Sequence, residues 1–232
     1  KVFDRGPFAV STIRWSLTIC FSLFFISYLQ AQPARAELIA LIRQARQYPD
    51  KERINTYPSF IQQWDRQQYA PDSIYVAALI DLSVCMRRSR LISQAIPWLR
   101  KAIAVYAKNN ATLRTEDQLK AYFLLSVHQR LLNQFPSCLI TVKQGLEFAS
   151  YVSPSRWTSR LYATLAFLLY QQGDYESALS HAHQAARYGQ VTQDDYAYAD
   201  GSYELGKALY KLQKFNESKQ ALQLSVSLAE QS

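Results

Sequence analysis

Apolar residues recur along most of the chain with the spacing of helices that bury one face. The clearest example runs from Leu161 to Ala185, where an apolar helix is followed by a Gly-Asp-Tyr turn and by a second helix. In the second helix, Ala178, Ala182 and Ala185 are three or four residues apart and therefore share one face. The chain contains only 6 Gly and 8 Pro in 232 residues, which favours long helices over a β-rich fold with frequent turns.

The helix-pair pattern repeats with a period near 40 residues, and self-similarity of this length is typical of solenoids. An apolar residue opens the second helix of each copy, and a Leu followed by a small residue lies in the first helix. The opening residues are Ile92, Phe135, Tyr175 and Phe215, and the Leu-small pairs are Leu82-Ser83, Leu125-Ser126, Leu165-Ala166 and Leu205-Gly206. The spacing predicts four units over 74–117, 118–157, 158–197 and 198–232.

These residues resemble the tetratricopeptide (TPR) repeat. Leu165 and Ala166 stand where the family has Leu-Gly, Tyr175 is the aromatic that opens helix B, and Ala178 is the small residue at the helix crossing. The period exceeds the usual ~34 residues. In the length of its period, the repeat is similar to long-period bacterial arrays, such as the N-terminal repeats of CHAT-domain proteins and of repeat-bearing sensor kinases. The resemblance implies an all-α, right-handed superhelical solenoid of antiparallel helix pairs.

Residues 37–73 do not follow the repeat but are helical in pattern. Apolar positions from Leu38 onward predict a helix that ends near Tyr48, and a second helix is expected over 59–69. Pro71-Asp72-Ser73 is predicted to be a linker that contains the N-cap of the first repeat. Because terminal units of a solenoid cover an open face, we expect 37–73 to be an N-terminal cap. The last helix shows no equivalent polar cap, which suggests a continuing polypeptide or a partner at that end.

Residues 1–36 are expected to be a signal peptide or a membrane anchor. The uncharged run Trp15–Leu29 follows Arg14 and is shorter than the ~20 residues that a spanning helix needs. Small residues at Ala34-Arg35-Ala36, or at Ala31, offer a cleavage site. The expected location is therefore periplasmic or extracellular, or anchored by this segment, with a buried core helix as the remaining alternative.

Charge and cysteine usage exclude several classes of function. From residue 37 onward there are 22 Lys and Arg against 17 Asp and Glu, a net charge of +5 without the extended basic stripe of a nucleic-acid-binding protein. Cys85 and Cys138 are too far apart for a zinc motif, and packed free thiols are the expected state.

No catalytic or cofactor-binding constellation is present in the sequence. His181 and His183 lie two residues apart on a helix and so face different sides, and Asp194-Asp195 is an adjacent pair expected in a solvated loop. Gly173 and Gly189 are interpreted as turn residues rather than parts of a phosphate loop. We therefore expect no enzyme activity, no cofactor and no metal.

The resemblance places helix A of each unit on the concave face, and its exposed positions follow from the Leu-small pair. Those positions predict a basic and aromatic groove, which suits a protein or peptide partner carrying carboxylates. The predicted partner-binding residues are Arg87, Arg88, Lys120, Arg130, Arg160, Tyr170, Tyr203, Lys207, Tyr210 and Lys211, with Phe123 and Phe167 beside them. The predicted function is a protein-interaction scaffold. The alternative is the sensory or regulatory arm of a larger signalling protein with a downstream kinase or CHAT protease-like effector.

Overall fold

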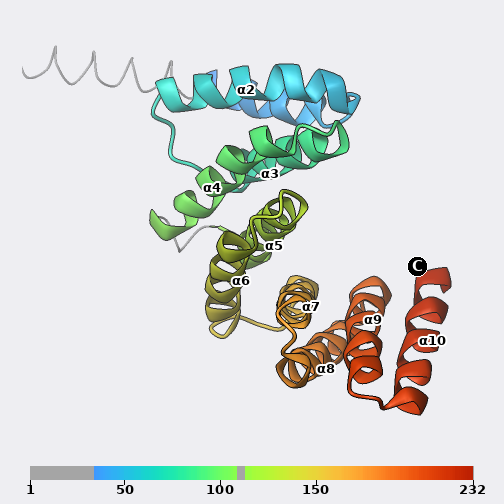
Figure 1. Cartoon of the computed structure of the whole chain (residues 1–232). Helices are drawn as coiled ribbons and strands as arrows, with labels where there is room; N and C mark the ends of the chain where they lie inside the picture. The colour runs from blue at the N-terminus through green and yellow to red at the C-terminus, as the bar shows by residue number, and fades with distance from the viewer. Residues whose placement is uncertain (1–33, 109–112, 232) are drawn as a thin grey trace, which may run out of the picture.

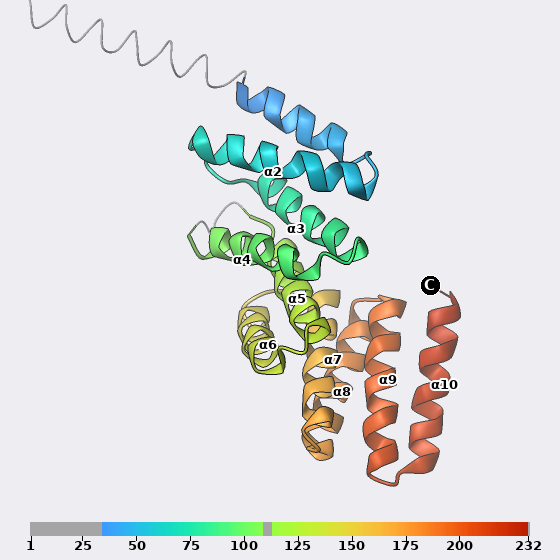
Figure 2. The same cartoon turned by 45° about the horizontal axis from the view of Figure 1, so that its top comes forward.

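The computed structural model describes residues 34–108 and 113–231, and these residues form helices and connecting turns with no strand among them. A helix over 34–45 comes first and lies alongside α2 (Figure 2). The following helices are α2 (Asp50–Arg66), α3 (Ser73–Arg88), α4 (Ile92–Lys108), α5 (Thr115–Leu131), α6 (Phe135–Ala149), α7 (Arg156–Gln171), α8 (Tyr175–Val191), α9 (Asp195–Lys211) and α10 (Phe215–Gln231). They follow one another along an arc from α2 to α10 (Figure 1).

The packing of the helices is that of a helical-repeat solenoid. From α2 onward, each helix packs against the next, and in addition α3 contacts α5, α5 contacts α7 and α7 contacts α9. Among the described residues, the alternate helices α4, α6, α8 and α10 do not contact one another. Helices α3, α5, α7 and α9 therefore lie on the inner side of the arc, whereas α4, α6 and α8 lie on its outer side (Figure 1).

The predicted repeat spacing is confirmed by the helix boundaries. Helices α4, α6, α8 and α10 begin at Ile92, Phe135, Tyr175 and Phe215, the four residues that define the period. Asp72 is the N-cap of α3, and its Oδ1 accepts hydrogen bonds from the backbone N–H groups of Ile74 and Tyr75.

The inner helices end in the same backbone motif. At the end of α9, the N–H of Gln213 donates to the carbonyl of Tyr210 (3.1 Å) and the N–H of Lys214 donates to the carbonyl of Leu209 (3.0 Å). This pair of bonds is the Schellman motif, whose central residue adopts a left-handed conformation. The central residues are Arg90, Asn133, Gly173 and Gln213, all with positive φ, and they keep the repeat spacing. Of these four turns, only the one at Gly173 has glycine, the residue that the left-handed conformation favours.

Two expectations about the N-terminal region are wrong in detail. The first helix ends at residue 45 rather than near Tyr48. Helix α2 begins at Asp50, well before the predicted residue 59, and continues through Pro58. An acidic first turn stabilises its start, and the burial of Tyr57 and Trp64 offsets the backbone hydrogen bond that Pro58 cannot donate.

The size of the buried side chains changes along the solenoid. Large side chains such as Trp64 and Tyr75 fill the N-terminal core, whereas α8 and α9 meet through Ala and Gly. A Cβ on Gly201 would lie 2.4 Å from the backbone nitrogen of Ala186, and one on Gly189 would lie 2.5 Å from the Cα of Tyr198. Gly189 therefore does not serve a turn, contrary to expectation, but lies within α8 and permits close backbone contact.

Several smaller expectations are settled by burial. A Cβ on Gly206 would lie 2.6 Å from Cγ of Leu222, which confirms a close helix crossing at that position, and Ala178 is buried. Cys85 and Cys138 are buried free thiols, and burial raises the pKa of each to about 11. Within the described ranges, no helix is both long and apolar enough to cross a membrane.

Candidate functional site

The inner face of the solenoid presents side chains from equivalent repeat positions of α5, α7 and α9. Lys120, Arg160 and Asp200 are spaced 40 residues apart and lie at the same position of successive units. Phe123 and Tyr203 occupy another such position, with Ala163 between them in the sequence. Because the inner helices contact one another directly, side chains from neighbouring units meet on this face.

Arg160 is the centre of one group of contacts. Its guanidinium lies 5.6 Å from the ring centroid of Phe123, 5.3 Å from that of Trp157 and 4.7 Å from that of Tyr196. The Lys120 ammonium also lies 5.8 Å from the ring of Trp157. A cation over a ring face is attracted by the negative potential of that face. These contacts join α5, α7 and α9 across the inner surface.

Lys207 is the centre of a second group. Its ammonium lies 5.2 Å from the ring centroid of Phe167, 4.8 Å from that of Tyr170 and 5.1 Å from that of Tyr203. The Arg130 guanidinium lies 4.9 Å from the same Phe167 ring. We call the two groups together the groove cluster, whose members are Lys120, Phe123, Arg130, Trp157, Arg160, Phe167, Tyr170, Tyr196, Tyr203 and Lys207.

Carboxylates on α9 offset part of the positive charge of the groove cluster. Asp200 lies 4.0 Å from Arg160, and Glu204 accepts a 2.8 Å hydrogen bond from Lys207. Burial raises the pKa of both carboxyls, although the cations beside them, Arg130 included, oppose the rise. The four cations of the groove cluster, Lys120, Arg130, Arg160 and Lys207, therefore outnumber these two carboxyls, which leaves a positive excess.

Two hollows among the described residues open on the inner face. A hollow of about 90 Å³ lies between Arg130 and Arg160 and includes Tyr203 and Glu204 in its lining. A larger hollow of about 360 Å³ lies between α3 and α5, and Lys120 lines it. In this second hollow most charges are paired internally, for example Arg46 with Asp81 (3.5 Å) and Arg114 with Asp117 (2.8 Å).

Six of the ten predicted partner-binding residues come together in the groove cluster, and four lie outside it. The six are Lys120, Arg130, Arg160, Tyr170, Tyr203 and Lys207. Arg88 instead lies 3.6 Å from Asp50 of α2, and Arg87 is half-buried near His128. Tyr210 packs edge-on against Phe215 at 5.5 Å, and Lys211 lies 5.9 Å from the ring of Tyr175. These last two residues lie at the end of α9 that turns into α10.

Sequence reasoning missed four residues of this face: Trp157, Tyr196, Asp200 and Glu204. Asp200 could have been identified from the sequence, because it occupies the same repeat position as Lys120 and Arg160. Trp157 and Tyr196 are in the first turns of α7 and α9, upstream of the positions that the repeat pattern marks as exposed. The signal for them is the contact with Arg160, which only the structure shows.

The remaining candidate groups show no catalytic or metal-binding arrangement within the described residues. No group of three or more His, Cys, Asp or Glu side chains there could hold a metal ion. His128 is fully buried, with Nδ1 at hydrogen-bond distance from the Leu124 carbonyl and Nε2 3.4 Å from the Ser83 carbonyl. Asp194 caps α9 by accepting from the N–H of Ala197. Asp194 therefore has a structural role.

Comparison with known proteins defines the fold. No family model matches the chain, and no curated protein matches its sequence. Among solved structures, BtubC (BKLC) from P. vanneervenii superimposes with a TM-score of 0.67 at 13% identity, covering 95% of this chain and 89% of that one. A kinesin light chain-like protein with nearly identical TPR-like repeats from Podosopora anserina superimposes with a TM-score of 0.59 at 15% identity, covering 84% and 95%.

A third solved structure contains a peptide. It is the Rap conjugation gene regulator of the plasmid pLS20 in complex with the Phr* peptide, with a TM-score of 0.61 at 14% identity. The match covers 79% of this chain and 49% of that one. At these identities the similarity concerns the fold alone, and it shows that the chain has the TPR-type helical-repeat fold.

Proposed function

We propose that this chain is a protein-interaction scaffold that binds a peptide segment of a partner on the inner face of its solenoid. The observation that supports this most directly is the groove cluster, in which cations from three helices stack on rings that remain partly open to solvent. Tyr203, for example, is 50% exposed. Exposed rings and cations of this kind supply both contact area and charge-assisted hydrogen bonds to a ligand.

The comparison with the Rap regulator supports the class of ligand, since that protein of similar fold was solved with a bound peptide. A solenoid offers an extended concave surface that can follow a peptide over several repeats. The proposal for this chain depends on its own inner face, because the likeness itself concerns only the fold.

The chemistry of the inner face favours a peptide with carboxylates near aromatic or aliphatic side chains. Lys120 and Arg130 form no ion pair within the described residues, although Arg130 lies near Asp200 and Glu204 and Lys120 lies near Asp81. Their charges are therefore less fully compensated than those of Arg160 and Lys207. Arg160 and Lys207 already face Asp200 and Glu204. A ligand carboxylate is therefore expected to engage Lys120 and Arg130 first.

The test is a binding screen of the 232-residue chain against matched acidic, neutral and basic peptides at low and moderate salt. We expect acidic peptides to bind, with association slowing as salt increases past the ~10 Å Debye length reached near 0.1 M. The double change Lys120→Ala/Arg130→Ala should lower mainly the on-rate, because it removes steering charge. Tyr203→Ala should raise mainly the off-rate, because it removes contact area that salt does not screen.

A matched control is the double change Arg187→Ala/Lys219→Ala, which removes the same charge from exposed positions on α8 and α10. It should leave both rates within about twofold of the unchanged chain. If the peptides that bind show no acidic bias, or if both double changes act equally, the inner face is not the recognition surface.

We also propose that residues 1–33, which lie outside the described residues, direct export or anchoring of the chain. Arg35, just beyond them, donates a 2.9 Å hydrogen bond to Asp72 and lies 5.5 Å from the ring of Trp64. Cleavage at Ala34-Arg35-Ala36 would remove this contact, so Ala31 is the favoured site. Fusing residues 1–40, behind an added Met, to a reporter active only outside the cytoplasm should give signal. Mass spectrometry of the mature N-terminus then separates cleavage from anchoring, and a reporter that stays inactive contradicts the proposal.

The alternative function is a regulatory arm of a larger signalling protein, with the same inner face as its sensing surface. It differs from the scaffold only in the domain to which the repeats are joined. The reading frame that contains this chain distinguishes the two directly, since an effector domain in that frame supports the arm.

A further inference from the structure

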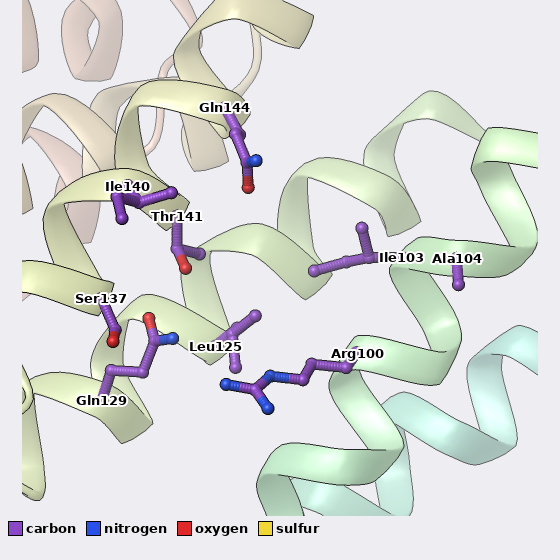
Figure 3. A pocket seen from close by; sticks show the side chains of 9 residues that line it. All are labelled: Arg100, Ile103, Ala104, Leu125, Gln129, Ser137, Ile140, Thr141 and Gln144. Carbon is purple, nitrogen blue, oxygen red and sulfur yellow. The ribbon is translucent and has the colours of Figure 1, made fainter.

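The outer face of the solenoid has a slot between the first two repeats. Its lining comes from α4, α5 and α6, and its volume is about 360 Å³. Ile103 of α4 points toward Ile140 and Thr141 of α6 across the slot, and Leu125 of α5 forms its floor (Figure 3). The slot exists because α4 and α6 do not contact each other. Its floor on α5 is largely buried, since Leu125 is 5% exposed.

Two polar side chains in the slot lack partners within the described residues. Gln129 of α5 is only 2% exposed, yet its Oε1 has no hydrogen-bond partner. Arg100 of α4 is exposed, forms no ion pair or ring contact there, and extends toward Gln129 (Figure 3). A buried amide oxygen without a partner costs free energy, and both side chains point into the same apolar slot. The slot therefore contains an unused hydrogen-bonding group and an unused cation beside an apolar floor.

We propose that this slot is a second binding site, which takes an apolar side chain of a partner protein together with a neighbouring carboxylate. The apolar side chain would lie on Ile103, Leu125 and Ile140, the carboxylate would pair with Arg100, and a backbone N–H of the bound segment would donate to Gln129. This site lies on the opposite side of the helix pairs from the groove cluster, so it does not depend on binding at the inner face.

The shape of the slot favours a protein segment over a free small molecule. Pockets for small ligands enclose most of the ligand surface, whereas Ile140 on the rim of this slot is 59% exposed. A larger partner surface that also covers Ile140 would remove this apolar area from water. Lys143, one turn further along α6, is exposed and adds positive charge on the same helix, which is complementary to an acidic segment.

The experiment follows methyl signals of Ile and Leu in the 232-residue chain by NMR while a probe is added. The probe is the capped peptide acetyl-Glu-Glu-Leu-Leu-Glu-Glu-amide, and the comparison probes are its Lys-for-Glu analogue and N-acetyl-leucine. The titrations are made in the Lys120→Ala/Arg130→Ala background, so that binding at the inner face is suppressed. We expect the acidic peptide to shift the signals of Ile103, Leu125 and Ile140 and the basic peptide to shift none of them.

Two rim changes test the assignment without altering the core. Arg100→Glu and Ile140→Glu are at exposed positions and should each weaken binding of the acidic peptide at least tenfold. Arg187→Glu, the same charge change at an exposed position of α8, is the matched control and should leave the affinity unchanged. Equal affinity in the rim and control variants, or shifts confined to other methyl groups, would overturn the proposal.

Gln129→Leu separates binding from folding. Because it replaces an unpartnered buried amide by an apolar side chain of similar size, it should raise the midpoint of thermal unfolding while weakening peptide binding several-fold. A variant that is less stable, or one that binds as well as the unchanged chain, contradicts the role given to Gln129. Binding of N-acetyl-leucine as tight as that of the peptide would make the slot a small-molecule site and defeat the commitment to a protein segment.

Discussion

The strongest prediction about this fold concerns the left-handed residues at the ends of its helices. Gln193 and Gln213 have φ values of 51° and 60°, in the region that L side chains disfavour. Both residues are exposed. Replacing either one by Gly removes the clash between Cβ and the backbone and leaves the hydrogen bonds of the turn intact. We therefore expect Gln193→Gly and Gln213→Gly to stabilise the chain.

The magnitude follows from two opposing contributions. A left-handed conformation costs an L residue about 1–2 kcal/mol, and Gly loses about 0.5–1 kcal/mol more backbone entropy on folding. The net gain should be about 0.5–1 kcal/mol for each change, and about 1–2 kcal/mol for the double variant, since the two turns are separate. For a chain of this length, that corresponds to about 2–4 °C in thermal midpoint per kcal/mol.

The assay is urea unfolding of the whole chain followed by far-ultraviolet circular dichroism. Gln213→Ala, which keeps a Cβ, is the control and should unfold within about 0.5 kcal/mol of the unchanged chain. The reverse change, Gly173→Ala, should cost about 1 kcal/mol, because φ at Gly173 is 83° although a Cβ would meet nothing within 4 Å. If Gln213→Gly is neutral and Gly173→Ala is tolerated, the shared turn geometry is incorrect.

Further predictions concern packing and pH. Gly201→Ala should cost about 1–3 kcal/mol of unfolding free energy, because the α8 and α9 backbones must separate. Leu165→Ala should cost about 2–5 kcal/mol through the cavity left at a buried position. A urea midpoint equal to that of the unchanged chain would contradict either packing prediction. Burial lowers the pKa of His128 below 6.5, so the unfolded chain binds its proton more readily and stability should fall as pH decreases below about 6.5, by at most about 1.4 kcal/mol per pH unit. The unfolding free energy of the unchanged chain minus that of His128→Leu should therefore decrease from pH 8 to pH 5.5. A difference that stays constant over this range would contradict the assignment.

The helix pairs could be predicted from the sequence because their signals are local and repeated. Phe135, Tyr175 and Phe215 open their helices at the predicted spacing, and Gly206 lies at a close crossing as expected. The region before the repeats was harder to predict, because the expected helix over 59–69 begins at Asp50 in the structure and has Pro58 in its interior. A single proline can be tolerated where neighbouring side chains are fully buried, and burial cannot be read from one segment alone.

The composition of the inner face could be predicted only in part. The repeat positions identified Lys120, Arg160 and Lys207 as side chains of one surface, and the structure brings them together there. The positions do not show which cations already have partners. Asp200 comes within reach of Arg160 through the packing of α7 against α9, and Glu204 pairs with Lys207 three residues along α9. The charge available to a ligand is therefore smaller than the count of Lys and Arg suggests.

The alternation of inner and outer helices explains why the two candidate sites lie where they do. Between α8 and α9 the connection is short, over 192–194, and Gly189 and Gly201 let the two backbones touch. The groove cluster is assembled on α5, α7 and α9, and α7 contacts both of the other two helices. On the outer side, α4 and α6 do not contact each other, and the slot lies between them over α5. The same alternation of helices thus closes the inner face and opens the outer one.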